Sequence, residues 1–346
     1  MQTLLTAEFA PMEARLVDGL PEGDGWRFEP KWDGFRCLAF KDGDTVELLG
    51  KSGKPLGRYF PEIVEACRRV RPDRFVLDGE LIVPAGETLS FEALEARLHP
   101  AASRVARLSR ETPARMMLFD CLMMDGTPTV ADAYTSRRAA LDRLVAAFAG
   151  EPAFAVSPYT EDRPTAARWL AGVGGALDGV VAKRLDEPYR PGERAMVKVK
   201  RHRSADCVVG GFRYEAGTRQ VGSLLLGLYD AEGRLDHVGF TSGILDKDKP
   251  ALTARLEALV GPPGFDGRAP GGPSRWNVGK DTRWEPLRPE IVVEVRYDHV
   301  TAGRFRHGTR LLRFRPDKAP RDCGFDQIGR EPMPAEVLAG VTGGAG

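Results

Sequence analysis

The chain contains 346 residues, of which 42% are hydrophobic and 29% are charged, an ordinary composition for a globular protein. This length predicts two domains or one large domain. The formal net charge is only +1, so bulk charge alone does not identify a nucleic-acid-binding protein. A case for such binding must depend on where the charges lie along the chain.

The cysteines argue against a disulfide framework and against a zinc site, because they are five in number, widely spaced and without a C-x-x-C pair. We expect most of them to be small buried residues in a reducing compartment. The N-terminal sequence does not have the pattern of a secretory signal, and no apolar stretch is long enough to span a membrane. These observations predict a cytoplasmic protein with no membrane association. The charge balance gives no reason to expect an obligate oligomer, so we expect a monomer.

The first 202 residues predict an α+β domain built on antiparallel sheets. Strand patterns alternate through residues 26–50, and the turn residues KDGD predict a hairpin between FRCLAF and TVELL. Further strands are predicted by the apolar runs FVLDGELIV, MMLFDCLMM and GVVAKR. Helical spacing is predicted for FPEIVEACRRV, FEALEARL with Ser90 as its N-cap, SRRAALDRLVAAFA and TAARWLAG.

The pattern changes to short strands near residue 200, directly after the basic segment KVKRHR. The strands are CVVGGFRYE, SLLLGLYD, LDHVGFTSG, EIVVEVRYDHV and TRLLRFRP, and one helix, PALTARLEALV, interrupts them. Five strands and one helix predict a small oligonucleotide-binding (OB) barrel over residues 203–330. Residues 261–275 are rich in Gly and Pro and predict a loop, and residues 331–346 predict a disordered tail.

A candidate nucleophile lies in residues 29–36, which read Glu-Pro-Lys-Trp-Asp-Gly-Phe-Arg. A lysine amine is a good nucleophile only when it is deprotonated, and nearby cations and partial burial lower its pKa. Neutral Lys31 would attack the α-phosphate of a nucleotide and release pyrophosphate, and the Asp-Gly pair would let the chain turn tightly after it. The alternative is a hairpin with a charged rim, because K-x-D-G also occurs by chance.

Several other charged side chains fall on predicted strands. Asp78 and Glu80 share one strand face, which suits contacts with a sugar hydroxyl and a metal, and the alternative is a solvated face. Asp120 lies inside an apolar run and therefore needs a partner, whereas the neighbouring Phe119 is either a stacking ring or a core residue.

Two basic patterns predict anion binding. Lys198 and Lys200 alternate with apolar residues, so their ammonium groups lie side by side on one strand face. This is unfavourable unless an anion such as a triphosphate lies between them, and the alternative is an exposed basic strand. Arg313 and Arg315 are predicted to alternate in the same way on a strand face, where the alternative is binding of the DNA backbone without catalysis.

Taken in order, these motifs resemble those of the covalent nucleotidyltransferases, the superfamily of DNA ligases, RNA ligases and mRNA capping enzymes. The chain is most similar to the small bacterial ATP-dependent DNA ligases called ligase C, and the resemblance covers roughly residues 10–320. It implies a nucleotidyltransferase domain with an ATP-grasp-like arrangement of antiparallel sheets, followed by an OB-fold domain.

The resemblance also implies roles for individual residues. Lys31 is the nucleophile, and Glu80 and Asp178 hold the metal, although the family usually has glutamate at the position of Asp178. The residues implied in nucleotide binding are Glu29 (adenine amino group), Arg36 (ribose), Glu80 (ribose hydroxyl), Phe119 (adenine ring), Lys183 on the strand of the metal motif, Lys198 and Lys200 (both α-phosphate), and Arg313, Arg315, Asp317 and Lys318 of the last motif. Lys51 matches the segment that grips the nicked strand, where the family commonly has arginine, and it is counted with the nucleotide-binding residues.

The implied cofactors are ATP and Mg²⁺, with Mn²⁺ as an alternative metal, and the implied partner is nicked double-stranded DNA. The resemblance further implies a role in DNA repair, beside a repair polymerase or end-joining proteins. The rival interpretations are an RNA ligase or GTP-using capping enzyme, and a non-catalytic nucleic-acid-binding protein. Glu29 and the barrel motif favour ATP and DNA, and the intact set of Lys31, Glu80, Lys198 and Lys200 argues against a decayed enzyme.

Overall fold

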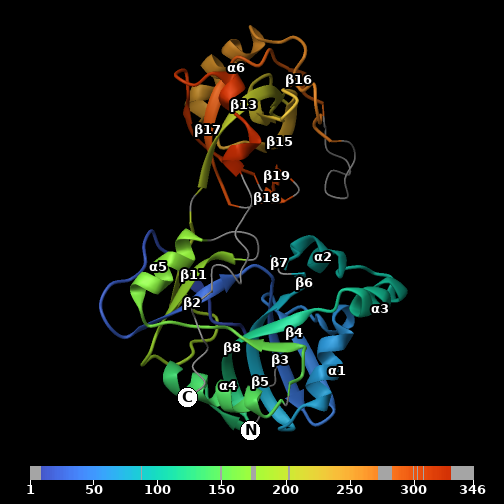
Figure 1. Ribbon diagram of the computed structural model, residues 1–346, viewed down its shortest axis with the longest axis vertical. Coiled ribbons are helices and arrows are strands. Elements are labelled where there is room, and N and C mark those ends of the chain that lie inside the picture. The colour runs from blue at the N-terminus through green and yellow to red at the C-terminus, as the bar shows by residue number, and fades with distance from the viewer. Residues whose placement is uncertain are drawn as a thin grey trace. The chain divides into compact units, whose positions relative to one another are not determined.

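The computed structural model describes residues 9–86, 88–148, 150–172, 177–201, 203–271, 283–298, 300–301, 303–306 and 308–328. The described chain divides between Arg201 and Arg203 into two compact units, each shown in Figure 1. None of the helices within these residues has the length and apolar character needed to cross a membrane. All five cysteines are buried as free thiols.

Two sheets form the first unit. The four-stranded sheet has the order β1-β12-β11-β2, with β1 (Ala14–Leu16) parallel to β12 (Met196–Val199) and with β11 (Leu177–Arg184) antiparallel to both β12 and β2 (Trp26–Trp32). The six-stranded sheet has the order β10-β8-β5-β3-β4, and β9 pairs with β8. Its strands are β3 (Phe35–Asp42), β4 (Thr45–Gly50), β5 (Arg74–Ile82), β8 (Arg115–Met124), β9 (Thr127–Pro128) and β10 (Phe154–Val156). The predicted hairpin is β3–β4.

Alternation along the strands builds a core on each face of the six-stranded sheet. Cys37 and Ala39 of β3 belong to the cluster with α1 (Pro61–Arg69) and α4 (Tyr134–Ala146). Leu38 and Phe40 point to the other face and pack in the cluster that includes Met196 of the four-stranded sheet. Because successive strand side chains point to opposite faces, one strand supplies both cores. On the four-stranded sheet, Trp169 of α5 (Arg163–Ala171) packs with residues of β2, β11 and β12.

The chain passes from one sheet to the other at Asp33 and Gly34, because β2 and β3 belong to different sheets. The sequence suggested that the Asp-Gly pair permits a tight turn, but Gly34 does not have a positive φ angle. Its role is instead close approach: a Cβ at Gly34 would lie 2.2 Å from the carbonyl oxygen of Leu81 and 2.9 Å from Cγ of Glu80. A glycine here lets the segment after Lys31 lie directly against β5.

The remaining elements of the first unit are a small hairpin, β6 (Pro84–Ala85) with β7 (Thr88–Leu89), and the helices α2 (Phe91–Ala96) and α3 (Ala102–Glu111). The predicted N-cap of α2 is confirmed, because the backbone N–H of Ala93 donates to the Ser90 hydroxyl at 3.0 Å. The sequence did not predict α3. The predicted helix over 136–149 begins earlier, at Tyr134.

The second unit is a five-stranded barrel of the predicted type. Its sheet has the order β15-β14-β13-β17-β20, and a short β16 (Glu285–Pro286) pairs with β13. The strands are β13 (Arg203–Tyr214), β14 (Val221–Tyr229), β15 (Leu235–Thr241), β17 (Val292–Tyr297) and β20 (Arg310–Phe314). Thr241 at the end of β15 makes a parallel bridge to Thr309, just before β20, so the two edge strands meet and close the sheet.

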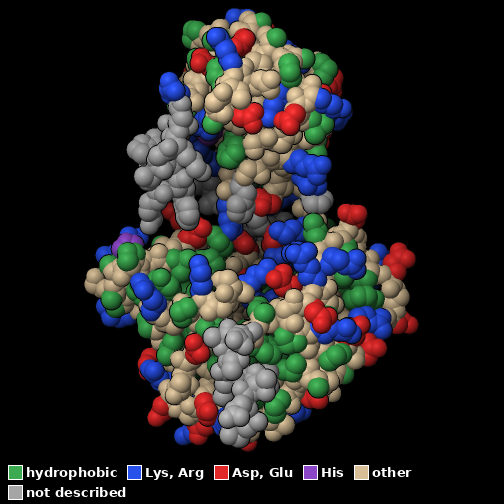
Figure 2. Space-filling view, turned by 180° about the vertical axis from the view of Figure 1, so that it is seen from behind, with side chains coloured by type: hydrophobic (Ala, Val, Ile, Leu, Met, Phe, Trp, Pro, Cys, Tyr) green, Lys and Arg blue, Asp and Glu red, His purple; other side chains and the backbone are tan. Residues whose placement is uncertain are grey.

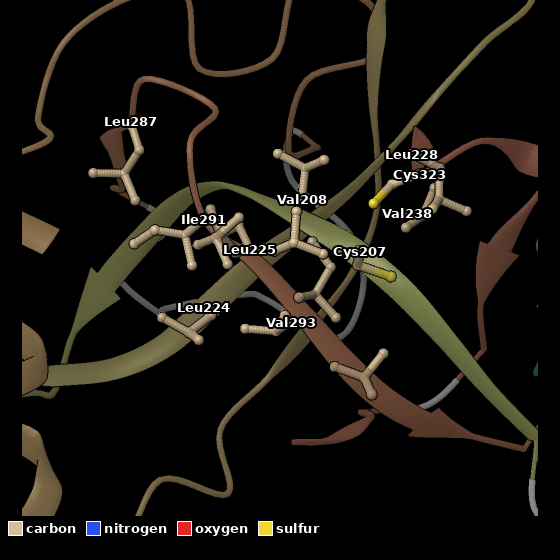
Figure 3. Packing of buried hydrophobic residues seen from close by; sticks show 14 of the residues in the cluster. Cys207, Val208, Leu224, Leu225, Leu228, Val238, Leu287, Ile291, Val293 and Cys323 are labelled. Carbon is tan, nitrogen blue, oxygen red and sulfur yellow. The ribbon is translucent and has the colours of Figure 1, made fainter. Parts of the chain in front are cut away.

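Buried apolar side chains of the barrel strands form one core cluster. Figure 3 shows Leu224 and Leu225 of β14 packed with Val293 of β17, together with Cys207 of β13 and Cys323. The helix α6 (Lys249–Glu257) follows β15, and a small hairpin, β18 (Val300–Thr301) with β19 (Arg304–Phe305), precedes β20. The part of the predicted loop that the structure describes, residues 261–271, contains no helix or strand, and the predicted tail over 331–346 lies outside the described residues.

Candidate active site

A pocket in the first unit gathers most of the residues singled out from the sequence. Its lining comes from β1, β2, β3, β5, β8, β11 and β12, from the segment before β1, and from Lys51 just after β4. The predicted site residues in the lining are Glu29, Lys31, Arg36, Lys51, Glu80, Phe119, Lys183 and Lys198. Residues far apart in the sequence therefore converge on one cavity, as a single ligand site requires.

Lys31 lies near the end of β2, opposite an irregularity in β11. The pairing of β11 with β2 shifts register between Leu177 and Gly179, so Asp178 is the bulged residue, and Gly179 pairs with Lys31. Bulges of this kind re-aim a side chain. Asp178 reaches Lys31, with 2.6 Å between its carboxylate oxygen and Nζ, and the same oxygen lies 2.8 Å from Nζ of Lys200.

Gly179 permits this arrangement sterically. A Cβ at this position would lie 2.1 Å from the carbonyl oxygen of Val199, and the φ angle of +145° is one that other residues rarely adopt. The glycine thus lets the end of β12 approach β11 closely enough for Lys200 to meet Asp178.

The protonation of Lys31 differs from the expectation. The sequence suggested that burial and nearby cations, including Lys198, lower its pKa. Burial does act to lower the pKa of Lys31, but the carboxylates of Asp178 and Glu80 outweigh it, so the pKa is raised above the ordinary value. Without nucleotide, Lys31 is a protonated ion-pair partner rather than a poised nucleophile.

Glu80 and Lys198 have perturbed pKa values of their own. Burial raises the pKa of Glu80 to about 7, although Lys31 and Arg36 act against this shift. The pKa of Lys198 is lowered by burial and by the neighbouring ammonium groups of Lys31 and Lys200. A carboxyl with a raised pKa beside an amine with a lowered pKa marks a site built for a charged ligand.

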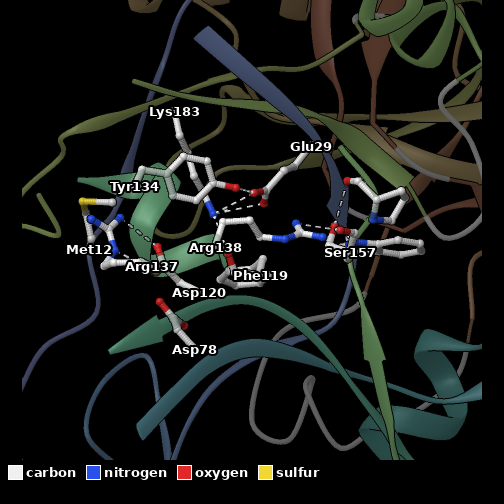
Figure 4. A network of polar contacts seen from close by, with 12 residues as sticks. Met12, Glu29, Asp78, Phe119, Asp120, Tyr134, Arg137, Arg138, Ser157 and Lys183 are labelled. Carbon is white, nitrogen blue, oxygen red and sulfur yellow. Dashed lines mark hydrogen bonds and ion pairs between the residues drawn. The ribbon is translucent and has the colours of Figure 1, made fainter. Parts of the chain in front are cut away.

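The two ends of the pocket differ in character. Lys51 is largely exposed and pairs with Glu13 at 3.0 Å, so the cationic end faces solvent. At the other end Glu29 is only 2% exposed and pairs with Lys183 at 3.0 Å. The hydroxyl of Tyr134 donates a hydrogen bond to the same Glu29 carboxylate, and Figure 4 shows both donors converging on it.

Phe119 lies at this buried end because of a second bulge. Asp78 of β5 pairs with Asp120 and Gly79 pairs with Leu118, so Phe119 is the extra residue of β8. Its ring lies between two cations, with the Arg36 guanidinium 4.6 Å and the Lys183 ammonium 4.9 Å from the ring centre. The ring is buried and also lines the pocket, so its position is compatible with either of the roles considered from the sequence.

Two buried carboxylates face each other behind the pocket, and each has its own arginine. Asp78 accepts two hydrogen bonds of 2.6 Å from Arg36 and one of 2.7 Å from the Tyr189 hydroxyl. Asp120 accepts bonds of 2.8 and 3.1 Å from Arg137, and this is the partner that the apolar run required. Such fork-like pairs fix the orientation of both side chains. They orient Arg36, a predicted ribose contact, along the pocket wall.

The predicted metal residues contribute two carboxylates, and both act electrostatically on Lys31. Across the described residues, no group of three or more His, Cys, Asp or Glu side chains could hold a metal ion. Two hard oxygen donors suit Mg²⁺, which binds proteins through one or two carboxylates and takes its other ligands from phosphates and water.

The last predicted motif lies in the second unit. Arg313 is exposed on β20 and pairs with Glu294 of β17 at 2.7 Å. Arg315 lies just past the strand end, where its guanidinium pairs with Asp206 at 2.9 Å and with Asp317 at 2.8 Å. A hydrogen bond from Arg315 lowers the pKa of Asp317 to about 2. Lys318 donates its backbone N–H to the Arg315 carbonyl at 3.2 Å.

The contacts of Arg313 and Arg315 agree with the expected alternation, because Arg313 pairs with Glu294 and Arg315 with Asp206, and these two carboxylates are cross-strand partners. Arg315 itself lies one residue past the end of β20, and the register shift between β17 and β20 lies before Arg313, at Leu312. Leu312, the residue before Arg313, is 46% exposed, so both faces of β20 reach solvent.

Sequence reasoning missed the residues that hold the site from behind. Tyr134, Arg137 and Tyr189 are all buried and bond to Glu29, Asp120 and Asp78 respectively. The sequence offered a signal for Arg137 alone, which lies at the polar start of the predicted helix over 136–149.

The charges are unevenly distributed over the surface despite the balanced total. Figure 2 shows a concentration of Lys and Arg side chains in the upper part of the first unit, whereas both signs mix elsewhere on the same face. An uneven basic surface is the electrostatic footprint expected for a phosphate-rich ligand.

Comparisons with known proteins agree across both units. Residues 11–200 match the family model described as ATP dependent DNA ligase domain, and residues 217–318 match the ATP dependent DNA ligase C terminal region. DNA ligase C2 of Mycolicibacterium smegmatis is 46% identical over 348 residues, covering 95% of this chain and 97% of that protein. The multifunctional non-homologous end joining DNA repair protein LigD of Mycobacterium tuberculosis is 30% identical over 321 residues, covering 90% of this chain and 39% of that protein.

A solved structure supports the fold alone. A chain from a structure-function analysis of Lig E DNA ligases is 18% identical and has a TM-score of 0.53, with 86% of this chain and 100% of that chain covered.

Proposed function

Because the chain belongs to the ATP-dependent DNA ligase family, we propose that it seals DNA nicks through an AMP group carried on Lys31. The observation that carries this proposal is the convergence of Lys31, Glu80 and Lys198 on one pocket, with Asp178 joining Lys31 to Lys200 directly beside it. Family membership favours DNA ligation over RNA ligation or mRNA capping.

In the first step, Nζ of Lys31 attacks the α-phosphorus of ATP. An N–P bond forms, the P–O bond to pyrophosphate breaks, and pyrophosphate leaves. The attacking amine must first lose its proton, and the Asp178 oxygen at 2.6 Å is the nearest acceptor. Lys198 and Lys200 neutralise the charge that develops on the phosphate oxygens, so catalysis depends mainly on positioning and electrostatics.

Glu80 and Asp178 would hold Mg²⁺, with Mn²⁺ as an alternative. The ion would supply charge neutralisation for the phosphate groups. With a cation held there, the Asp178 and Glu80 carboxylates would hold the proton of Lys31 less strongly, which would favour the free amine that a nucleophile needs.

At the buried end of the pocket, Glu29 accepts a hydrogen bond from the adenine amino group, Phe119 stacks on the base, and Arg36 contacts the ribose. Lys183 bridges the Glu29 carboxylate and the Phe119 carbonyl oxygen. Lys51 at the open end contacts phosphate of the nucleotide or the nicked strand. The last motif, with Arg313, Arg315, Asp317 and Lys318, orients the departing pyrophosphate.

In the later steps, AMP passes from Lys31 to the 5′-phosphate at a nick, and the 3′-hydroxyl then attacks that phosphate. The new phosphodiester bond forms as AMP leaves. The similarity to a protein whose name states end joining and DNA repair supports a repair role, beside a repair polymerase or end-joining proteins. We propose that the chain does this as a cytoplasmic monomer.

The first experiment is the intact mass of the protein after incubation with ATP and Mg²⁺. The wild type should gain one AMP, and Lys31→Ala and Lys31→Arg should gain none. Lys31→Arg is the sharper variant, because it keeps a cation opposite Asp178 and removes only the nucleophilic amine. Lys54→Ala, at an exposed lysine after β4, is the control that should label normally.

The same samples then receive a nicked DNA duplex. Only the samples that form the AMP adduct should seal the nick. Labelling that persists in Lys31→Arg would overturn the assignment of the nucleophile. A wild type that starts without AMP and never gains it would overturn the proposed chemistry.

A further inference from the structure

The first turn of α4 places three polar side chains behind the nucleotide pocket. Tyr134, Arg137 and Arg138 stand at positions i, i+3 and i+4, which lie on one face of a helix. They are 1%, 0% and 5% exposed. Arginine is almost never buried to this extent unless it is paired, so each side chain must hold something specific.

Each of the three holds a different residue near the site. Arg137 fixes Asp120, the residue after Phe119. Arg138 donates to the carbonyl of Ser157 at 2.9 Å, and the Ser157 hydroxyl accepts a bond of 2.9 Å from the indole N–H of Trp32, the residue after Lys31. Figure 4 shows Arg137, Arg138 and Tyr134 pointing from α4 toward these groups.

Of the three, Tyr134 reaches the buried end of the pocket. Its hydroxyl donates to Glu29, whose second donor is Lys183 at 3.0 Å. Lys183 is itself anchored by the Phe119 carbonyl at 3.1 Å. A carboxylate has about four acceptor positions, so Glu29 can accept a further hydrogen bond while both donors hold it.

We propose that Tyr134 is a positioning residue that sets the choice between purine bases by fixing the carboxylate of Glu29. This inference rests on the proposed contact between Glu29 and adenine. Adenine has an amino group at its position 6, which donates a hydrogen bond to a carboxylate. Guanine has a carbonyl oxygen there, which a carboxylate repels. Discrimination of this kind is strong only when the carboxylate cannot turn away. Without the Tyr134 hydroxyl, Lys183 is the one side chain of the described residues still bonded to Glu29, and the carboxylate can pivot about it.

The test is Tyr134→Phe, which removes the hydroxyl and keeps the ring. Rates of covalent adduct formation are measured against ATP concentration and against GTP concentration. Loss of a hydrogen bond to a charged group should raise KM for ATP about tenfold and leave kcat within about twofold. The preference for ATP over GTP should fall by about the same factor of ten, because GTP gains nothing from a well-placed Glu29.

Tyr159→Phe is the matched control. The Tyr159 ring lies 4.0 Å from the Arg27 guanidinium and 4.6 Å from that of Arg138, but its hydroxyl makes no hydrogen bond within the described part of the chain. Its nucleotide preference should equal that of the wild type. In a Glu29→Ala background, adding Tyr134→Phe should leave the preference unchanged, because the group that Tyr134 positions is gone.

The outcomes separate this inference from the proposed function. A wild type that forms no adduct would overturn the proposed function. A wild-type adduct with an unchanged ATP-to-GTP preference in Tyr134→Phe would overturn the role of Tyr134 alone, as would an equal loss with both nucleotides. Because the preference is a ratio within one protein sample, a smaller folded fraction cancels from it.

Discussion

The buried pair of Asp120 and Arg137 gives a prediction whose size follows from the structure. Both side chains are 1% exposed, and their closest atoms are 2.8 Å apart. Arg137→Met keeps most of the side-chain volume but strands the Asp120 carboxylate, which retains a 3.1 Å bond from the backbone N–H of Cys121. Removing one partner of such a pair costs about 3–5 kcal/mol, because the other charge stays buried.

A domain of this size should then melt about 8–16 °C lower for a loss of about 4 kcal/mol. Differential scanning calorimetry measures this shift. Arg107→Met is the control, because Arg107 lies 3.6 Å from Glu111 and both side chains are more than half exposed. That substitution should shift the transition by no more than about 2 °C.

A second variant separates charge from packing. Asp120→Asn combined with Arg137→Met removes the stranded charge, so the double variant should be more stable than Arg137→Met alone. If Arg137→Met shifted the transition no further than Arg107→Met, the reasoning about the buried charge would be refuted.

Three further predictions concern the chemistry. Adduct formation should become faster from about pH 6 to about pH 9, because the raised pKa of Lys31 leaves little free amine at low pH, and a flat single-turnover profile would contradict this. Gly34→Ala should abolish most adduct formation, since its Cβ would lie 2.2 Å from a backbone oxygen, whereas Gly19→Ala, with nothing within 4 Å, should label normally in the same assay. Arg313→Ala should slow adduct formation with ATP yet leave sealing of a pre-adenylylated nick intact, and equal losses in both assays would argue against a role confined to the first step.

Much of the fold follows from local pattern. The hairpin of β3 and β4 was predictable because turn residues separate two alternating runs, and the five barrel strands were predictable for the same reason. Ser90 was recognisable as an N-cap because it directly precedes a helical pattern. In each case the deciding interactions lie within a few residues of one another.

The assignment of strands to sheets was not predictable from such patterns. Strands β2 and β3 are separated by Asp33 and Gly34 alone, yet they belong to different sheets. The short connection suggested a turn, but Gly34 is required by the approach of β5, a strand about forty residues further on. Contacts of that separation leave no local signature.

The candidate site also has a part that the sequence predicted and a part that it could not. The pocket brings together Lys31, Glu80 and Lys198 as the motifs suggested. The raised pKa of Lys31 could not be predicted, because it depends on the bulge that aims Asp178. Tyr134 was missed because its partner, Glu29, lies 105 residues away.

The bulge at Asp178 has a consequence for how the enzyme turns over. Its carboxylate sits between two ammonium groups, where a phosphate is expected to bind, so it serves the empty enzyme as a resident counter-ion. Under the proposed mechanism, Asp178 would turn to the metal as a phosphate binds beside the two lysines, so the lysines would exchange one anion for another. Such an exchange limits the net free energy gained when a phosphate group binds, and it makes the release of that group correspondingly easier. A catalyst that must release both pyrophosphate and AMP in every cycle benefits from carrying its own replacement for them.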